Sequence, residues 1–199
     1  FANVFKKQWK NLPLAIKKRY VNRSYSNDVV TVKGKLNVHC SWVIYLLKPL
    51  LKIFNTLVPY QGKDIPVTVN LTSKSDSNLL HFNRTFYFPH KEYHFRSRMM
   101  VMKDNSVIEF MRFNLGWHMN YFYDGKKVIM EHRRYVWKIC KFLIPLPLSL
   151  ILGKGYAEEE ALSDNEFRMY FEIRHKLFGK VYGYDGNFII REDQDRKDE

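Results

Sequence analysis

The strongest constraint on the fold of this chain is an alternation of apolar and polar residues that recurs between residues 65 and 190. In residues 65–71, and again in residues 167–173, every second side chain is apolar. A period of two gives each strand one apolar face, as in an antiparallel sheet that packs on a core. Turn signals such as Asp124-Gly125 separate the alternating segments and favour hairpins between consecutive strands. We therefore predict about eight to ten antiparallel strands in a meander.

A sheet of this length must curl, so we expect a half-barrel or a barrel that packs on N-terminal helices, an α+β fold that is mainly β. The single domain covers residues 1–190, with helices at 2–20 and 41–57 and the antiparallel sheet at 31–39 and 65–190. The 199 residues are 46% apolar, which is enough for one buried core. Residues 191–199 are almost wholly charged or polar, so we predict a charged, disordered tail.

Three local features refine this outline. Pro13 interrupts the first helical segment, because proline disturbs a helix interior, and a second helix is expected to begin there. Residues 107–123 are expected to form one long strand that bends at Gly116. Residues 139–152 contain Pro145 and Pro147 and are expected to form a packed loop or a short helix.

The net charge of +13 is concentrated in residues 1–60, which hold eleven lysines or arginines and one acidic residue, Asp28. A basic surface attracts anionic lipid headgroups or nucleic acid, although it can also serve solubility alone. Aromatic residues among the lysines suit single-stranded nucleic acid, but no RNA-binding signature is present. No apolar run approaches the roughly 20 residues of a membrane span. We expect a cytoplasmic protein that contacts anionic membranes peripherally through residues 1–60.

Signatures of catalysis, metal binding and cofactor binding are absent from the sequence. His90 and His94 stand four residues apart without a companion ligand, whereas zinc sites use three or four. Cys40 and Cys140 are two isolated cysteines, which indicates neither a disulfide framework nor a metal site. The expectation is a protein that is not an enzyme and that holds neither a metal nor a cofactor.

Charged residues interrupt the apolar strands, and they are the candidate ligand-binding residues. Arg98 lies diagonal to Glu109 if the hairpin pairs Met102 with Val107. Such residues form an exposed ion-pair ladder of little energetic value, or they face a barrel interior and bind an anionic headgroup or carboxylate. Catalysis by Glu109 is disfavoured, because a carboxylate beside an arginine is a poor base. The six candidates are Arg96, Arg98, Glu109, Arg112, His132 and Arg134.

The helix expected at 41–57 is amphipathic, and Lys48, Lys52 and Asn55 share its polar face. This helix either covers an open mouth or face of the sheet, or it acts as a lid over a ligand cavity or as a membrane contact. Trp42, Lys48 and Lys52 are the candidate residues for that lid or membrane contact. The apolar face holds Val43, Leu46, Leu47, Leu50, Phe54 and Leu57.

Several short motifs follow one another in a distinctive order across residues 5–184. They are Trp9-Lys10-Asn11-Leu12-Pro13, Gly34, Gly62-Lys63-Asp64-Ile65-Pro66-Val67, Phe95-Arg96-Ser97-Arg98, Glu109-x-x-Arg112-Phe113, Pro145-Leu146-Pro147 and Val181-Tyr182-Gly183-Tyr184. In this order they resemble a bacterial family, domain of unknown function 4166. Its members are often fused behind an NAD(P)-binding domain similar to saccharopine dehydrogenase, which implies a fused or separate Rossmann-type dehydrogenase as a partner. The resemblance implies no activity.

Two hypotheses about function follow. The first is a non-enzymatic module that binds an apolar or amphiphilic, lipid-like ligand between the sheet and the helix, since cavities in such places are usual ligand sites. The alternative is an accessory or assembly domain of an NAD(P)-dependent dehydrogenase-like protein, with no ligand of its own. Binding of nucleic acid and catalysis are weaker alternatives.

Overall fold

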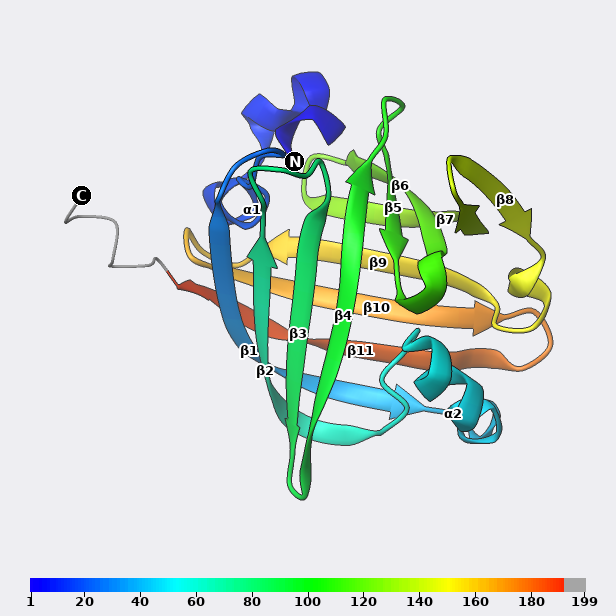
Figure 1. Cartoon of the computed structure of the whole chain (residues 1–199). Coiled ribbons are helices and arrows are strands. Elements are labelled where there is room, and N and C mark those ends of the chain that lie inside the picture. Colours follow the sequence, from blue (N-terminus) through cyan, green and yellow to red (C-terminus); the bar gives the residue numbers. More distant parts are fainter. Residues whose placement is uncertain (192–199) are drawn as a thin grey trace.

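The computed structural model describes residues 1–191 and shows an antiparallel β-barrel (Figure 1). Eleven strands form one sheet, and the pairing of β6 with β7 closes ten of them into the barrel. The predicted antiparallel meander is confirmed, and of the two predicted shapes the barrel is correct and the half-barrel is wrong. The strands are β1 Val29–Cys40, β2 Gly62–Thr72, β3 Leu80–Phe88, β4 Lys91–Val101, β5 Ser106–Phe110, β6 Leu115–Tyr123, β7 Lys127–Ile139, β8 Phe142–Leu146, β9 Lys154–Ala161, β10 Glu166–His175 and β11 Gly179–Arg191.

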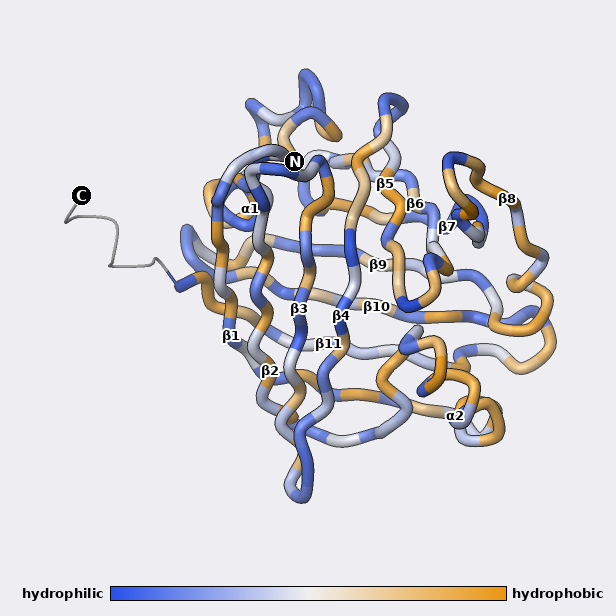
Figure 2. Tube along the Cα trace, in the orientation of Figure 1, coloured by the Kyte–Doolittle hydropathy of each residue, from blue (hydrophilic) through white to orange (hydrophobic). Residues whose placement is uncertain are grey.

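The alternation of residues places the core inside the barrel. On β3, Leu80, Phe82, Arg84 and Phe86 are buried, while the alternate side chains His81, Asn83 and Thr85 are more exposed. Figure 2 shows the corresponding change between apolar and polar colours along the strands. Burial of each large apolar side chain contributes about 1.5–3 kcal/mol, and this term holds the barrel together. The predicted tail at 191–199 lies outside the described residues, except for Arg191, which ends β11.

The two ends of the barrel differ, because helices fill one of them. Three short helices cover the end where β10 begins: the 3-10 helices η1 (Ala2–Val4) and η2 (Lys6–Asn11), and α1 (Leu14–Arg19). Phe1 and Phe5 are buried there against Tyr121 at ring-centroid distances of 5.7 and 6.4 Å. We call this the closed end. The predicted break at Pro13 is confirmed, since η2 ends at Asn11 and Pro13 caps α1.

The opposite end of the barrel is called the mouth, and α2 (Trp42–Phe54) lies beside it (Figure 1). The backbone N–H of Ser41, which precedes α2, donates to the carbonyl of Val181 at 2.9 Å, close to where β11 begins. The helix was predicted to bury Leu46 and Leu50, but both are exposed, and the buried side chains are Val43, Ile44 and Leu51. No helix within residues 1–191 is long and apolar enough to cross a membrane.

The single strand predicted at 107–123 is wrong, because the chain reverses there. β5 and β6 are separate strands that pair antiparallel, and Phe110 lies opposite Gly116. A 3-10 turn, η3 (Arg112–Asn114), joins them, with positive φ angles of 57° at Phe113 and 58° at Asn114. Aromatic residues rarely adopt a positive φ, so the residue types around Phe113 do not signal a turn.

β7 changes partner along its length, and this opens the barrel wall at the mouth. Its first part, Lys127 to Glu131, pairs with β9, whereas Tyr135 to Ile139 pair with β8. The segment from β8 to the 3-10 helix η4 (Leu148–Leu150) therefore projects beside the mouth. The prediction of a packed loop or short helix at 139–152 is correct for η4 and missed β8.

Candidate functional site

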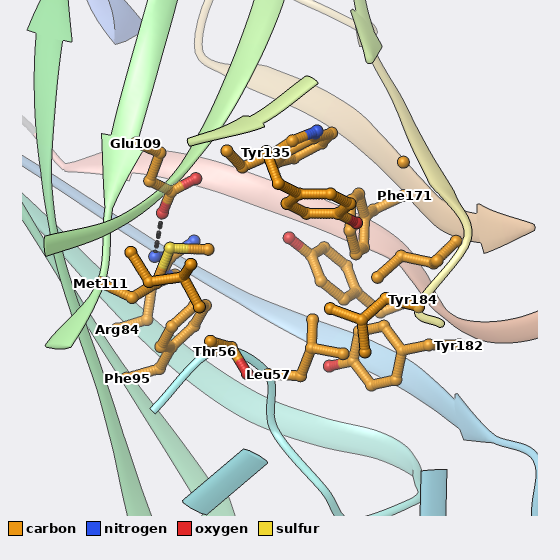
Figure 3. Close-up of a pocket in the computed structure, with 15 residues that line it drawn as sticks. Thr56, Leu57, Arg84, Phe95, Glu109, Met111, Tyr135, Phe171, Tyr182 and Tyr184 are labelled. Atoms are coloured by element: carbon orange, nitrogen blue, oxygen red, sulfur yellow. Dashed lines mark hydrogen bonds and ion pairs between the residues drawn. The ribbon is translucent and has the colours of Figure 1, made fainter. Parts of the chain in front are cut away.

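A cavity of about 50 Å³ lies inside the barrel towards the mouth (Figure 3). Its walls come from β3 to β7, from β9 to β11 and from connecting segments, including the one that follows α2. Most of the lining is aromatic or aliphatic, and a few polar groups lie on one side of the space. The lining residues are Thr56, Leu57, Arg84, Phe95, Glu109, Met111, Leu115, Trp117, Tyr135, Leu152, Gly155, Phe171, Ile173, Tyr182 and Tyr184.

The polar side of the cavity is a buried ion pair between Arg84 on β3 and Glu109 on β5, drawn as a dashed line in Figure 3. Arg84 is 7% exposed and Glu109 is 5% exposed. Ser97 accepts from Arg84 at 2.7 Å and donates to the Glu109 carboxylate at 2.6 Å. The guanidinium lies 4.1 Å from the ring centroid of Phe82 and 3.9 Å from that of Phe95. Arg84 Nε has no hydrogen-bond partner, so one buried donor faces this region unsatisfied.

The register of the β4–β5 hairpin decides which charged residues face inward. The predicted pairing of Met102 with Val107 is wrong, because Val101 lies opposite Val107. The connection to Val107 is one residue longer than expected, with Asn105 in the left-handed region at a φ of 60°. A shift of one residue moves a side chain to the other face of a sheet. Glu109 therefore points inward and Arg98 outward, so they form no pair.

Arg84 is the functional residue that the sequence interpretation missed. It lies on the apolar face of β3, between Phe82 and Phe86, where the alternation places every side chain in the interior. A lone arginine in such a row is the available signal, because a buried charge needs a partner within the core. The inward Glu109 is that partner.

The other predicted ligand-binding residues do not converge on the cavity. Arg96 and Arg134 are exposed on the outer surface, and Arg112 Nη1 donates to the carbonyl of Ile53 at 3.2 Å. Arg96, Arg98 and Arg112 do line one open depression on the outer side of β2 to β4. The six residues therefore divide between the interior and the outer surface.

His132 points into the barrel interior, next to the cavity wall. Its Nδ1 accepts a hydrogen bond of 2.8 Å from the indole N–H of Trp117, which lines the cavity. Burial, together with the charges of Lys154 and His118, lowers the pKa of His132 to about 4. The ring is therefore neutral near pH 7, as an acceptor nitrogen requires.

Three tyrosines complete the cavity's polar groups. Tyr135 donates its hydroxyl to the carbonyl of Gly153 at 3.1 Å. Burial raises the pKa of Tyr184 to about 12, and it also raises the pKa of Tyr135 and Tyr182. All three phenols therefore stay protonated at neutral pH and can act as hydrogen-bond donors. The Tyr184 hydroxyl faces the cavity in Figure 3.

A larger apolar groove of about 400 Å³ lies at the mouth. It shares Thr56, Leu115 and Leu152 with the cavity, so the groove lies directly next to the cavity. One wall is α2, and the others are η3, the end of β7, and the segment from β8 through η4. The lining residues are Leu47, Leu50, Leu51, Phe54, Thr56, Phe113, Leu115, Trp137, Leu146, Leu148, Ile151 and Leu152.

The predicted lid residues lie on α2 but outside this groove. Trp42 packs its ring edge-on against Phe178 at 5.6 Å. The ammonium groups of Lys48 and Lys52 lie 4.5 and 5.5 Å from the ring centroid of Tyr60. The helix therefore forms a groove wall with its leucines, while its lysines lie to the side.

Among the described residues, few side chains are placed to bind a metal ion or to act as a nucleophile or base. Within residues 1–191, no three His, Cys, Asp or Glu side chains are grouped so that they could hold a metal ion. Cys40 is buried and Cys140 is exposed, and both are free thiols. The Glu109 carboxylate is engaged by Arg84 and by the Ser97 hydroxyl. The arrangement suits the binding of a molecule with one apolar and one polar part.

Comparison with known proteins identifies a family for nearly the whole chain. None of the curated proteins compared with the chain matches it. A family model described as a domain of unknown function, DUF4166, matches residues 12–188, which include β1 to β10, most of β11 and the residues of both the cavity and the groove. The chain therefore belongs to the DUF4166 family.

Proposed function

We propose that this protein binds an amphiphilic, lipid-like molecule, with the hydrocarbon chain in the groove and the polar end in the cavity. The observation that carries the proposal is that the two spaces are adjacent: an apolar groove of about 400 Å³ shares three lining residues with a cavity that has a buried ion pair in its wall. Ligand sites in proteins commonly have volumes of about 300–1,000 Å³, with apolar walls and a few polar groups that fix orientation.

The charge of the cavity favours a neutral polar end. Arg84 and Glu109 already neutralise one another, so a ligand carboxylate would add an unpaired negative charge to a buried site. A hydroxyl or carbonyl oxygen adds no charge and can accept from the unsatisfied Arg84 Nε or from Tyr184. A cavity of about 50 Å³ has room for a few atoms and not for a ring system. The ligand class is thus a linear chain with a neutral end, such as a long-chain alcohol or monoacylglycerol.

The test compares 1-hexadecanol with palmitate, which share a chain length and differ in charge. Native mass spectrometry of delipidated protein should show a hexadecanol adduct in preference to a palmitate adduct. The fluorescence of Trp117 and Trp137, which line the two spaces, should report the affinity. Absence of a hexadecanol adduct, or stronger binding of palmitate, would overturn the proposed ligand class.

A pair of matched variants tests the location of the site. Leu152→Glu places a charge where the groove meets the cavity, whereas Leu162→Glu makes the same change on the exposed turn after β9, at the closed end. Burying a charge beside hydrocarbon costs several kcal/mol, so Leu152→Glu should weaken hexadecanol binding at least about tenfold. Leu162→Glu should leave binding unchanged, and equal affinities in the two variants would exclude this site. Thermal melting checks that both variants fold.

A further inference from the structure

Large apolar side chains are exposed around the mouth on four separate elements. Leu46 on α2 is 71% exposed, Leu150 in η4 is 72% exposed, and Leu177 in the β10–β11 turn is 82% exposed. Exposed apolar residues are ordinary when they are scattered, but a contiguous group marks an interaction surface. We call the following six residues the mouth rim: Trp42, Leu46, Leu50, Phe142, Leu150 and Leu177.

The exposed stripe on α2 follows helical spacing. Trp42, Leu46, Leu50 and Ile53 lie three or four residues apart and are all exposed, whereas Val43, Ile44 and Leu51 face the barrel. A helix at the surface of a globular protein normally carries polar residues on its outer face. On α2 both the buried side and this outer stripe are apolar, and within residues 1–191 most of the stripe is exposed, with Trp42 in contact with Phe178. Figure 2 shows that much of α2 is hydrophobic.

The charges around the mouth all have one sign. Residues 41–63, 132–157 and 173–184, which supply α2, β8, η4 and the β10–β11 turn, contain no aspartate or glutamate. The same segments hold Lys48, Lys52, Lys138, Lys141 and Lys176. Among the described ion pairs, none joins these five lysines to a carboxylate. The segments at the mouth therefore carry exposed apolar side chains together with lysines that have no carboxylate partner among the described ion pairs.

We infer that the mouth rim docks on the surface of an anionic phospholipid bilayer, with its apolar side chains in the interfacial layer and the lysines on the lipid phosphates. Interfacial binding draws on these two contributions together: buried apolar area and attraction between basic residues and anionic lipids. A second copy of the chain is a poor occupant, because two such mouths would bring like charges together. The inference does not depend on a ligand in the groove. If the mouth docks on a bilayer, a lipid could enter the groove without crossing water.

The sequence predicts a membrane contact through residues 1–60, and the geometry limits this contact to α2 within that segment. Of the helices in this segment, only α2 lies at the mouth, whereas the lysines of η2 lie at the closed end. The apolar residues Val4, Phe5 and Ile16 of the closed end are buried in the core. If the mouth docks on the bilayer, Lys48 and Lys52 provide the electrostatic attraction to anionic lipids, and Lys7 and Lys10 do not.

The experiment is co-sedimentation of the full chain with vesicles of phosphatidylcholine alone, or of equimolar phosphatidylcholine and phosphatidylglycerol. We expect binding to the mixed vesicles, which weakens strongly in high salt because screening acts within about 10 Å at 0.1 M. Lys48→Glu/Lys52→Glu and Leu46→Gln/Leu150→Gln should each reduce the partition coefficient about tenfold or more. Lys7→Glu/Lys10→Glu, with the same change in charge at the closed end, is the matched control and should bind as wild type does.

Three results would overturn the inference. The first is no binding of wild-type protein to the mixed vesicles at low salt. The second is an equal loss in the Lys7/Lys10 control, which would make net charge and not the mouth responsible. The third is a dimer in size-exclusion chromatography that Leu46→Gln/Leu150→Gln dissolves, which would make a second copy the occupant. Gly155→Ala, which narrows the cavity inside the barrel and adds no charge at the mouth, should still bind vesicles, so failure of the ligand proposal is distinguishable from failure of this one.

Discussion

The buried pair of Arg84 and Glu109 allows an asymmetric prediction about stability. Glu109→Leu leaves the guanidinium buried without a carboxylate, with Ser97, Tyr184 and the rings of Phe82 and Phe95 around it. Arginine cannot release its proton in a protein, so its charge stays uncompensated. Removing one partner of a buried pair costs about 3–5 kcal/mol, and cation–π contacts of about 0.5–2 kcal/mol do not restore it.

Arg84→Met is expected to cost less, because the carboxyl that remains can bind a proton. Glu109 would keep its contact with Ser97 and would become neutral as its pKa rises in the desolvated site. A raised folded-state pKa stabilises the fold at low pH, and this contribution is lost as the pH rises through that value. The destabilisation by Arg84→Met should therefore shrink between pH 7.5 and pH 5, whereas that of Glu109→Leu should not.

Urea unfolding of both single variants and of Arg84→Met/Glu109→Leu tests this reasoning. The double variant should fall within about 1 kcal/mol of wild type, because replacing a buried pair by apolar residues is often neutral. Glu109→Leu should melt about 6–20 °C below wild type, given about 2–4 °C per kcal/mol for a domain of this size. Additive effects of the two single changes, or an Arg84→Met penalty that does not vary with pH, would refute the argument.

Three further predictions concern the cavity wall and the thiols. The pKa of His132 falls from 6.5 in the unfolded chain to about 4 when folded, so the free energy of unfolding should decrease as the pH drops through this window. Urea unfolding at several pH values should show that the free energy of unfolding depends less on pH in His132→Gln than in wild type. In Gly155→Ala the added carbon would lie 2.4 Å from Trp117 Cζ2, so the indole must move; we expect about 1–3 kcal/mol of destabilisation and weaker hexadecanol binding in fluorescence titrations. Because burial raises the pKa of Cys40 to about 12, a thiol reagent should label Cys140 alone in native protein and both cysteines in denaturant.

Local sequence signals predicted most of the elements, and tertiary pairing decided the rest. Pro13 and Asp124-Gly125 act through their own backbone, so the helix break and the β6–β7 hairpin follow from the residue types. The turn at Phe113 has no such signal, because its positive φ is imposed by the strands on either side. The two partners of β7 are likewise chosen by the closed sheet and not by its own residues.

The candidate site was harder to predict, because it depends on register. Alternation shows that one face of each strand is buried, but the length of the β4–β5 turn decides that Glu109 joins Arg84 and not Arg98. Charge and sequence neighbours indicate the outer arginines as ligand-binding residues, whereas the cavity is built from residues on strands that are distant in the chain. The groove requires α2, η3 and η4 to meet in space, which periodicity along one segment does not encode.

Closure of the barrel by β1 and β11 has a consequence for how the molecule is made. Thr31 lies opposite Arg191 and Cys40 opposite Tyr182, so the seam joins residues that are far apart in the sequence. During synthesis β11 leaves the ribosome after the other ten strands, and until then β1 and β10 each present an unpaired backbone edge. Such edges are templates for pairing with other chains, and long-range pairing is slow. A nascent or prematurely terminated chain is thus an open sheet prone to aggregation, and its last thirteen-residue strand converts it into a closed one.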